Sequence, residues 1–147
     1  KNLKTMGMSL KPCTVFTTGK ESFEIADDEV EIGLGIHGEP GTHREKMTTA
    51  NEFTEKLFEK VYAESDVQKG DRFAVLVNGL GETTLIELFI INNHLQDLLK
   101  DKGVEVAKTL VGNYMTSLDM GGFSITLLKL DKEMEELLNA EEDTIAF

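Results

Sequence analysis

The pattern of hydrophobic and polar residues changes its period several times along the chain. Between residues 30 and 37, aliphatic side chains alternate with glycine or polar ones, which is typical of a β-strand with one buried face. A helical spacing begins after Thr49, where Thr49 and Glu52 form a capping-box pattern. The apolar residues that follow fall on one side of this predicted helix and are Phe53, Leu57, Phe58 and Val61.

The second half of the chain repeats this alternation of strand and helix. The unbroken apolar run at 73–77 predicts a central strand that is covered on both faces. A second capping box, formed by Thr84 and Glu87, opens a helix that Gly103 ends. We expect its buried side to consist of Leu85, Leu88, Phe89, Leu95 and Leu99.

Shorter alternating segments complete the predicted elements. Residues 6–11, 104–110 and 123–130 have the spacing of strands, and Asp131 is placed to cap a short helix that ends at Leu138. Strands and helices interleave without internal repeats. The sequence therefore predicts one α/β domain with a mixed β-sheet flanked by helices.

An early antiparallel hairpin is also expected. Residues 22–26 have the spacing of a short strand, and Asp27 and Asp28 tolerate the backbone of a turn. We predict that this strand pairs with the one that follows the turn, which carries His37.

The stretch around His37 is the candidate site. Its aliphatic residues point to one face and are Val30, Ile32, Leu34 and Ile36. Gly33 and Gly35 occupy the other face and leave the backbone bare, so that His37 stands at the end of a strip where a small molecule has room. Gly38 and Pro40 then stop the strand. A neutral imidazole carries a free lone pair and titrates near neutral pH, which makes His37 the best candidate nucleophile or base.

The glycines of this stretch also match a dinucleotide-binding pattern. Gly33, Gly35 and Gly38 spell G-x-G-x-x-G, but that motif requires its last glycine to open a helix. Here Pro40 and Gly41 force a turn instead. We therefore predict that Gly33, Gly35 and Gly38 contact a substrate and that the chain binds no cofactor of this kind.

Two other roles are possible for His37. His37, Glu39 and His43 spell H-x-E-x3-H, which could supply two metal ligands and a carboxylate. Neither the number of ligands nor their geometry is supported, so we expect no metal. The other alternative is a structural histidine at a strand end, inside an acidic interaction module without a ligand.

Composition narrows the classes of function. The chain has 147 residues and a formal charge of −12, from 27 acidic and 15 basic residues, which opposes binding to nucleic acid or to anionic membranes. The single cysteine, Cys13, cannot form an internal disulfide and is predicted to be a buried small residue. With no apolar signal-like run at its start, the chain is expected in the cytoplasm.

Five stretches together resemble one family over almost the whole chain. They are TMGMSLKPCT, EIGLGIHGEPG, VLVNGLG, LVGNYMTSLDMGGFSITLLKLD and DTIAF. In register, they are similar to the second, C-terminal half of the substrate-binding subunit of dihydroxyacetone kinases, and the form that depends on the phosphotransferase system fits best. The start at Lys1, without an initiator methionine, fits an expectation that the family's N-terminal domain is absent from this chain.

The resemblance implies a specific chemistry. The family's histidine in GIHGEPG, which is His37 here, adds to the ketone carbon of dihydroxyacetone and holds it as a covalent hemiaminal. A partner nucleotide-binding subunit, which carries ATP or ADP with magnesium, then phosphorylates a hydroxyl to give dihydroxyacetone phosphate in glycerol metabolism. The resemblance further implies a homodimer, and it implies that this piece alone is an inactive kinase.

Two departures from the family pattern keep a second function open. The family commonly has a small residue and then Thr-Pro after GLG, where this chain has Glu82, Thr83 and Thr84, and Phe147 stands where many relatives have tryptophan. The alternative is a dihydroxyacetone-sensing paralogue that acts as a transcriptional co-regulator.

Overall fold

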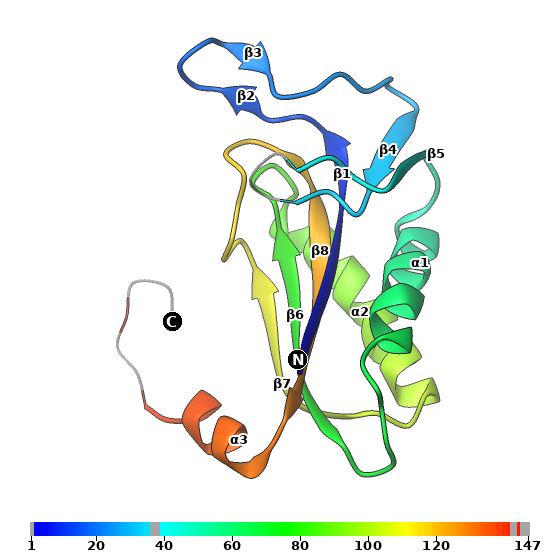
Figure 1. Ribbon diagram of the computed structural model, residues 1–147, viewed down its shortest axis with the longest axis vertical. Coiled ribbons are helices and arrows are strands. Elements are labelled where there is room, and N and C mark those ends of the chain that lie inside the picture. The colour runs from blue at the N-terminus through cyan, green and yellow to red at the C-terminus, as the bar shows by residue number, and fades with distance from the viewer. Residues whose placement is uncertain (1, 36–38, 142–143, 145–147) are drawn as a thin grey trace.

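The fold is an α/β domain built on one six-stranded mixed sheet (Figure 1). The computed structural model describes residues 2–35, 39–141 and 144. The strands follow the order β5-β4-β1-β8-β6-β7 across the sheet. Their bounds are Leu3–Lys11 for β1, Glu29–Ile32 for β4, His43–Lys46 for β5, Arg72–Gly79 for β6, Glu105–Gly112 for β7 and Gly121–Leu130 for β8. Only the β6–β7 pair is parallel, so the predicted mixed sheet is confirmed.

Three helices and a small hairpin complete the chain. The helices are α1 at Ala50–Ala63, α2 at Leu85–Asp101 and α3 at Lys132–Leu138. A separate two-stranded hairpin joins β2 at Thr14–Val15 to β3 at Lys20–Glu21 and projects from one end of the sheet (Figure 1). None of the helices within the described residues is long and apolar enough to cross a membrane.

The hydrophobic core lies between the sheet and helices α1 and α2. Alternate residues of β6 and β8 enter it, namely Phe73, Val75, Val77, Phe123, Ile125 and Leu127. The predicted buried side of α1 is confirmed, because Phe53, Leu57, Phe58 and Val61 all belong to the same core. Burial of these side chains is the main stabilising contribution to the fold.

The predicted helix caps are confirmed in detail. The Thr49 hydroxyl accepts a hydrogen bond from the Glu52 backbone N–H at 3.3 Å, and the Glu52 carboxylate accepts one from the Thr49 backbone N–H at 3.2 Å. Thr84 donates from its N–H and its hydroxyl to Glu87, at 2.9 and 2.7 Å. These two hydrogen bonds hold the pKa of Glu87 below its ordinary value. Gly103 follows α2 with φ +69°, as its predicted role in ending the helix requires.

The predicted hairpin forms with a different partner. Residues 22–26 are not a strand. Instead, β4 pairs antiparallel with β1 on one side and with β5 on the other, so the hairpin is β4–β5. A turn signal fixes where the chain reverses but not which strand pairs with which. Pairing with β1 places Val30 and Ile32 in the main core, a burial that residues 22–26 could not provide.

The position of β6 also differs from the prediction. This strand lies next to the edge strand β7, while β1 and β8 are at the centre of the sheet. Helices α1 and α2 cover one face of β6, whereas Ala74 and Leu76 on the other face are only half-buried. An apolar run predicts a strand, but by itself it does not show that both faces are covered.

Helix α2 buries a narrower side than we predicted. Leu88, Leu95 and Leu99 are buried as expected, but Leu85 and Phe89 are 53% and 55% exposed. Ile91, which the prediction missed, is buried. The first turns of α2 are apolar at nearly every position, so the helical period does not identify one face there.

Candidate ligand-binding site

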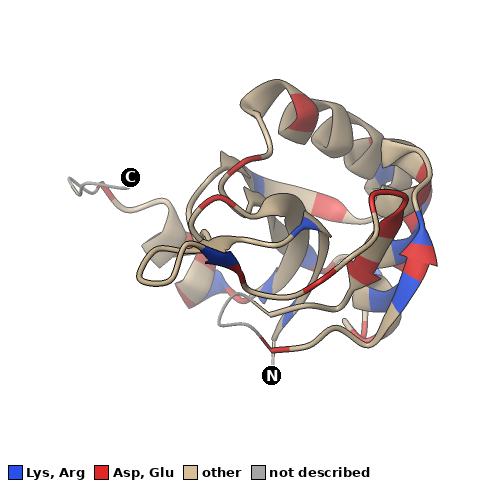
Figure 2. Cartoon of the chain, turned by 90° about the horizontal axis from the view of Figure 1, so that it is seen from above, with Lys and Arg blue, Asp and Glu red and all other residues tan. Residues whose placement is uncertain are grey.

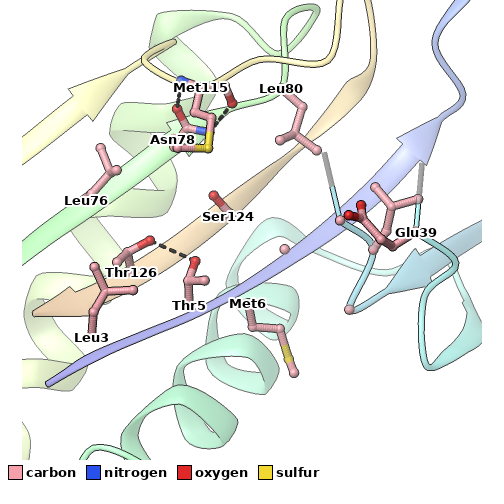
Figure 3. A pocket seen from close by; sticks show the side chains of 14 residues that line it. Leu3, Thr5, Met6, Glu39, Leu76, Asn78, Leu80, Met115, Ser124 and Thr126 are labelled. Carbon is pink, nitrogen blue, oxygen red and sulfur yellow. Dashed lines mark hydrogen bonds between the residues drawn. The ribbon is translucent and has the colours of Figure 1, made fainter. Parts of the chain in front are cut away.

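An open cavity of about 490 Å³ lies against the sheet face that α1 and α2 leave uncovered (Figure 3). It is lined by β1, β6 and β8, by residues 33–35, and by Glu39. Its floor contains the strand residues that alternate with the core residues, including Thr5 and Gly7 on β1, Ser124 and Thr126 on β8, and Leu76 on β6. Successive residues of these strands therefore point alternately into the core and into the cavity.

The floor is made from residues far apart in the sequence. The register of β1 and β8 places Thr5 opposite Thr126 and Gly7 opposite Ser124. The hydroxyls of Thr5 and Thr126 are 2.8 Å apart and share a hydrogen bond (Figure 3). Small side chains and hydroxyls thus give a shallow floor with polar atoms, which suits a small hydroxylated ligand.

Asn78 fixes the loop at the far side of the cavity. Its side chain is buried, and its oxygen accepts hydrogen bonds from the backbone N–H groups of Tyr114 and Met115, each at 2.9 Å. Its amide nitrogen donates to the Met115 carbonyl at 2.8 Å (Figure 3). These bonds hold Met115, which lines the cavity, in place. Asn78 is therefore a structural support of the cavity wall.

The segment that follows β4 does not continue the strand, in contrast to the prediction. Gly33 has φ +81°, a conformation that favours glycine, and its N–H donates to the Gly7 carbonyl at 2.7 Å. Beyond this bend, Leu34 leaves the main core and packs in a second cluster with Cys13, Leu80 and Met120. The predicted alternation is therefore wrong at Gly33 and Leu34, because a positive φ rotates the chain out of the strand, while Ile36 lies outside the described residues.

The two ends of the loop between β4 and β5 are tied together. Gly35 N–H donates to the Glu39 carbonyl at 3.3 Å, and Thr42 N–H donates to the Ile32 carbonyl at 2.7 Å. The buried carboxylate of Glu31 accepts from Gly41 N–H at 2.6 Å. These bonds join the described backbone before residue 36 to the described backbone after residue 38.

The predicted site residues are only partly described. Gly33 and Gly35 both line the cavity, while His37 and Gly38 lie outside the described residues. The face that we expected to be bare carries the side chain of Glu39, because a Cβ added at Gly35 would overlap the Glu39 carboxylate. Gly35 is thus needed for the close approach of Glu39, which Figure 3 shows at the edge of the cavity.

Charge is distributed unevenly between the cavity and the rest of the surface. Figure 2 shows acidic and basic residues interspersed around the molecule. Near the β4–β5 hairpin several of them pair, as in Lys46 with Asp28 at 2.8 Å and Arg44 with Glu31 at 3.4 Å. Among the described residues that line the cavity, Glu39 is the only ionisable one. The cavity is otherwise apolar or neutral.

Of the two histidines in the metal alternative, His43 is described and His37 lies outside the described residues. His43 contacts the Thr42 hydroxyl at 2.9 Å and the Glu45 carboxylate at 2.8 Å through its two ring nitrogens. No group of three His, Cys, Asp or Glu side chains within the described ranges is placed to hold a metal. Cys13 is buried, as predicted, and accepts a hydrogen bond from the Ser117 hydroxyl at 3.7 Å.

Comparison with known proteins identifies the family. A family model described as the Dak1 domain matches residues 1–146. The chain belongs to the Dak1 domain family. The resemblance of its five stretches to dihydroxyacetone kinase subunits is therefore confirmed. This Dak1 domain is 48% identical, over 99% of its length, to the dihydroxyacetone-binding subunit of PTS-dependent dihydroxyacetone kinase 1 from Listeria innocua. It is 37% identical, over 97% of its length, to the dihydroxyacetone-binding subunit of the PEP-dependent kinase from Escherichia coli.

The matches cover less than half of each of these relatives. The chain spans 45% of the Listeria subunit and 47% of the Escherichia coli subunit. Among solved structures, a dihydroxyacetone kinase operon co-activator superposes with a TM-score of 0.87 at 39% identity, covering 95% of this chain and 43% of that one. The dihydroxyacetone kinase of C. freundii in complex with AMP-PNP and Mg²⁺ gives 0.76 at 28% identity, covering 95% and 26%.

Several lining residues escaped the sequence analysis. Thr5, Ser124 and Thr126 come from strands more than 110 residues apart and meet only through the β1–β8 register. The sequence analysis included Asn78 only as part of the stretch VLVNGLG. The alternation of β8 did contain one usable signal, because Ser124 and Thr126 are polar residues between core positions.

Proposed function

We propose that this Dak1 domain binds dihydroxyacetone covalently through His37 and presents it for phosphorylation. The observation that carries the proposal is the cavity at Gly33, Gly35 and Glu39, which flank residues 36–38 in a chain 48% identical to a dihydroxyacetone-binding subunit. Gly38 is proposed to contact the substrate along with Gly33 and Gly35.

The proposed covalent step is an addition without loss of water. The lone pair of a neutral ring nitrogen of His37 attacks the ketone carbon and forms a C–N bond. The carbonyl π electrons move to the oxygen, which takes up a proton, while the ring loses its N–H proton. The product is a hemiaminal whose mass is the sum of protein and ketone.

This chemistry explains selection among three-carbon compounds. Glycerol has no carbonyl carbon for the imidazole to attack, so it is excluded by mechanism more than by size. The neighbouring hydroxyls of Thr5, Ser124 and Thr126 provide neutral hydrogen-bonding groups for the terminal hydroxyls of the ketone. A small ligand with several hydroxyls fits such a lining.

Phosphorylation itself is assigned to a partner. In this proposal, ATP or ADP with magnesium is bound by a nucleotide-binding subunit, and the Dak1 domain carries no cofactor. The proposed phosphoryl donor is the phosphotransferase system, on which the similar kinases of Listeria innocua and Lactococcus lactis depend. The domain alone is expected to be inactive as a kinase, and the intact protein is expected to be a homodimer.

Native mass spectrometry of the intact protein tests the binding step. Wild type with dihydroxyacetone is expected to gain the mass of one ketone molecule per chain, and His37→Ala is expected to gain none. The variant should unfold within about 1 kcal/mol of wild type, as is common for substitutions outside the core. Equal capture by both proteins, or a collapse of the variant's fold, would contradict the proposal.

A sensor is the second candidate function. It is favoured by the likeness to the operon co-activator, which superposes with a higher TM-score than the kinase does. Reconstitution with the nucleotide-binding subunit, ATP, Mg²⁺ and the phosphoryl-donor proteins of the phosphotransferase system separates the two candidates. Formation of dihydroxyacetone phosphate supports the kinase subunit, whereas ketone capture without any turnover supports the sensor.

A further inference from the structure

Glu39 is placed where it can distinguish the neutral ketone from its phosphorylated product. It is the one ionisable residue among the described residues of the cavity lining, and the side chain is exposed to the cavity and solvent. Every other described lining residue is apolar, a glycine, or a neutral hydroxyl or amide. A change in charge at Glu39 therefore changes the electrostatic potential of the cavity more than a distant surface charge does.

The backbone next to Glu39 brings its carboxylate into the cavity. Gly35 lacks a Cβ, and a Cβ there would overlap the Glu39 carboxylate. Gly35 N–H also donates to the Glu39 carbonyl at 3.3 Å. The position of this carboxylate is thus built into the loop that joins β4 to β5.

We infer that Glu39 sets the preference of the cavity for a neutral hydroxylated ketone over the same molecule bearing a phosphoryl group. This inference rests on the proposed function and extends it to the release of product. A carboxylate accepts hydrogen bonds from hydroxyl groups. A phosphomonoester instead carries about two negative charges at neutral pH, which the carboxylate repels at short range.

The consequence is that the affinity of the cavity for its ligand falls when the ligand is phosphorylated. Before phosphoryl transfer, the ketone is neutral and its hydroxyls are compatible with Glu39. After transfer, the ligand is an anion beside a domain whose formal charge is already −12. Like charges then favour dissociation of the product.

The test compares two ligands in three versions of the intact protein. Dissociation constants for dihydroxyacetone and dihydroxyacetone phosphate are measured by calorimetry for wild type, Glu39→Gln and Glu59→Gln. Glu59 is exposed on α1, which packs on the opposite face of the sheet, so its substitution changes the net charge equally without touching the cavity. Glutamine keeps the size of the side chain and removes only the charge.

We expect the ratio of the two dissociation constants, phosphate over ketone, to fall about tenfold in Glu39→Gln and to stay within about twofold in Glu59→Gln. Raising the ionic strength should lower the wild-type ratio towards that of Glu39→Gln. Gly35→Ala, which displaces the carboxylate without neutralising it, should lower the ratio in the same direction.

The contrary outcomes are distinguishable. Ketone binding by wild type with an unchanged ratio in Glu39→Gln, or with an equal change in Glu59→Gln, would overturn this inference and leave the proposed function intact. An equal weakening of both ligands in Glu39→Gln would also overturn it and would make Glu39 a positioning residue for the loop. Absence of ketone binding by wild type would overturn both proposals.

Discussion

The two faces of the sheet are built from the same strands but differ in role: one packs in the hydrophobic core and the other lines the cavity. On the face under α1 and α2, Phe123, Ile125 and Leu127 of β8 are buried in the main core. On the other face, Ser124 and Thr126 of the same strand line an open cavity. Large apolar residues stabilise one face through burial, while small residues keep the other face shallow and accessible.

Alternate residues of these strands therefore contribute either to the stability of the fold or to the cavity. A substitution on the covered face is expected to change the free energy of unfolding, and a substitution on the cavity face is expected to change ligand binding. The described residues of the loop between β4 and β5 connect the two regions, because Gly33 follows a core strand and Gly33, Gly35 and Glu39 line the cavity.

The largest effect is expected from two residues of β8 that lie on opposite faces of the sheet. Leu127→Ala should lower the free energy of unfolding by about 2 to 5 kcal/mol, because it removes a fully buried side chain and leaves a cavity. Ser124→Ala, on the open face, should change it by less than about 1 kcal/mol. Urea unfolding of both variants measures the difference, and equal losses would show that the open face is also part of the core.

A smaller effect is expected where the chain leaves the covered face. Gly33→Ala should cost about 1 to 2 kcal/mol, since an alanine at φ +81° is strained and its Cβ would lie 3.0 Å from Thr42 Cγ2. Gly35→Ala has no positive φ, and the new Cβ meets the Glu39 side chain, whose carboxylate can rotate away. The thermal unfolding midpoint of Gly33→Ala should therefore lie below that of Gly35→Ala. The reverse order would contradict the bend at Gly33.

The smallest effect concerns the cap of α2, which covers the core. Hydrogen bonds from Thr84 lower the pKa of Glu87 from its ordinary 4.5. Because the folded-state pKa is the lower one, the ionised group stabilises the fold above the ordinary pKa, and this contribution is lost as the pH falls through the folded-state value.

Glu87→Gln keeps a hydrogen-bond acceptor and removes this dependence. It should lower the free energy of unfolding by about 0.3 to 1 kcal/mol near neutral pH, since the carboxylate lies at the positive end of a helix. The difference from wild type should vanish under acid conditions. Urea unfolding at several pH values checks this, and a difference that grew on acidification would refute the assignment.

Local signals in the sequence predicted much of the fold. Strands β2, β3 and β5 were not predicted. Both capping boxes, the end of α2 at Gly103, the strands β1, β4, β6, β7 and β8 and the mixed sheet follow from patterns within a few residues of each other. The hairpin partner did not, because β4 pairs with β1 about 20 residues upstream and with β5 downstream. Pairing depends on which strand can share a buried face, and a turn signal carries no such information.

The candidate site was predictable only in part for the same reason. The EIGLGIHGEPG stretch identified the loop, and Gly33 and Gly35 within it line the cavity, while Gly38 lies outside the described residues. Thr5 and Thr126 meet through a register that no local pattern encodes. The placement of Glu39 over Gly35 was also missed, because strict alternation was extended past Gly33, where the positive φ ends it.

The most direct test of the central claim is carbon NMR of the intact protein with dihydroxyacetone labelled with ¹³C at its ketone carbon. The account predicts that bound ligand loses the ketone resonance and gains one from a tetrahedral carbon bonded to both oxygen and nitrogen. It also predicts that His37→Ala, checked to be folded, does not produce the new signal. A bound ligand that keeps its ketone resonance, or a new signal that survives in His37→Ala, would contradict it.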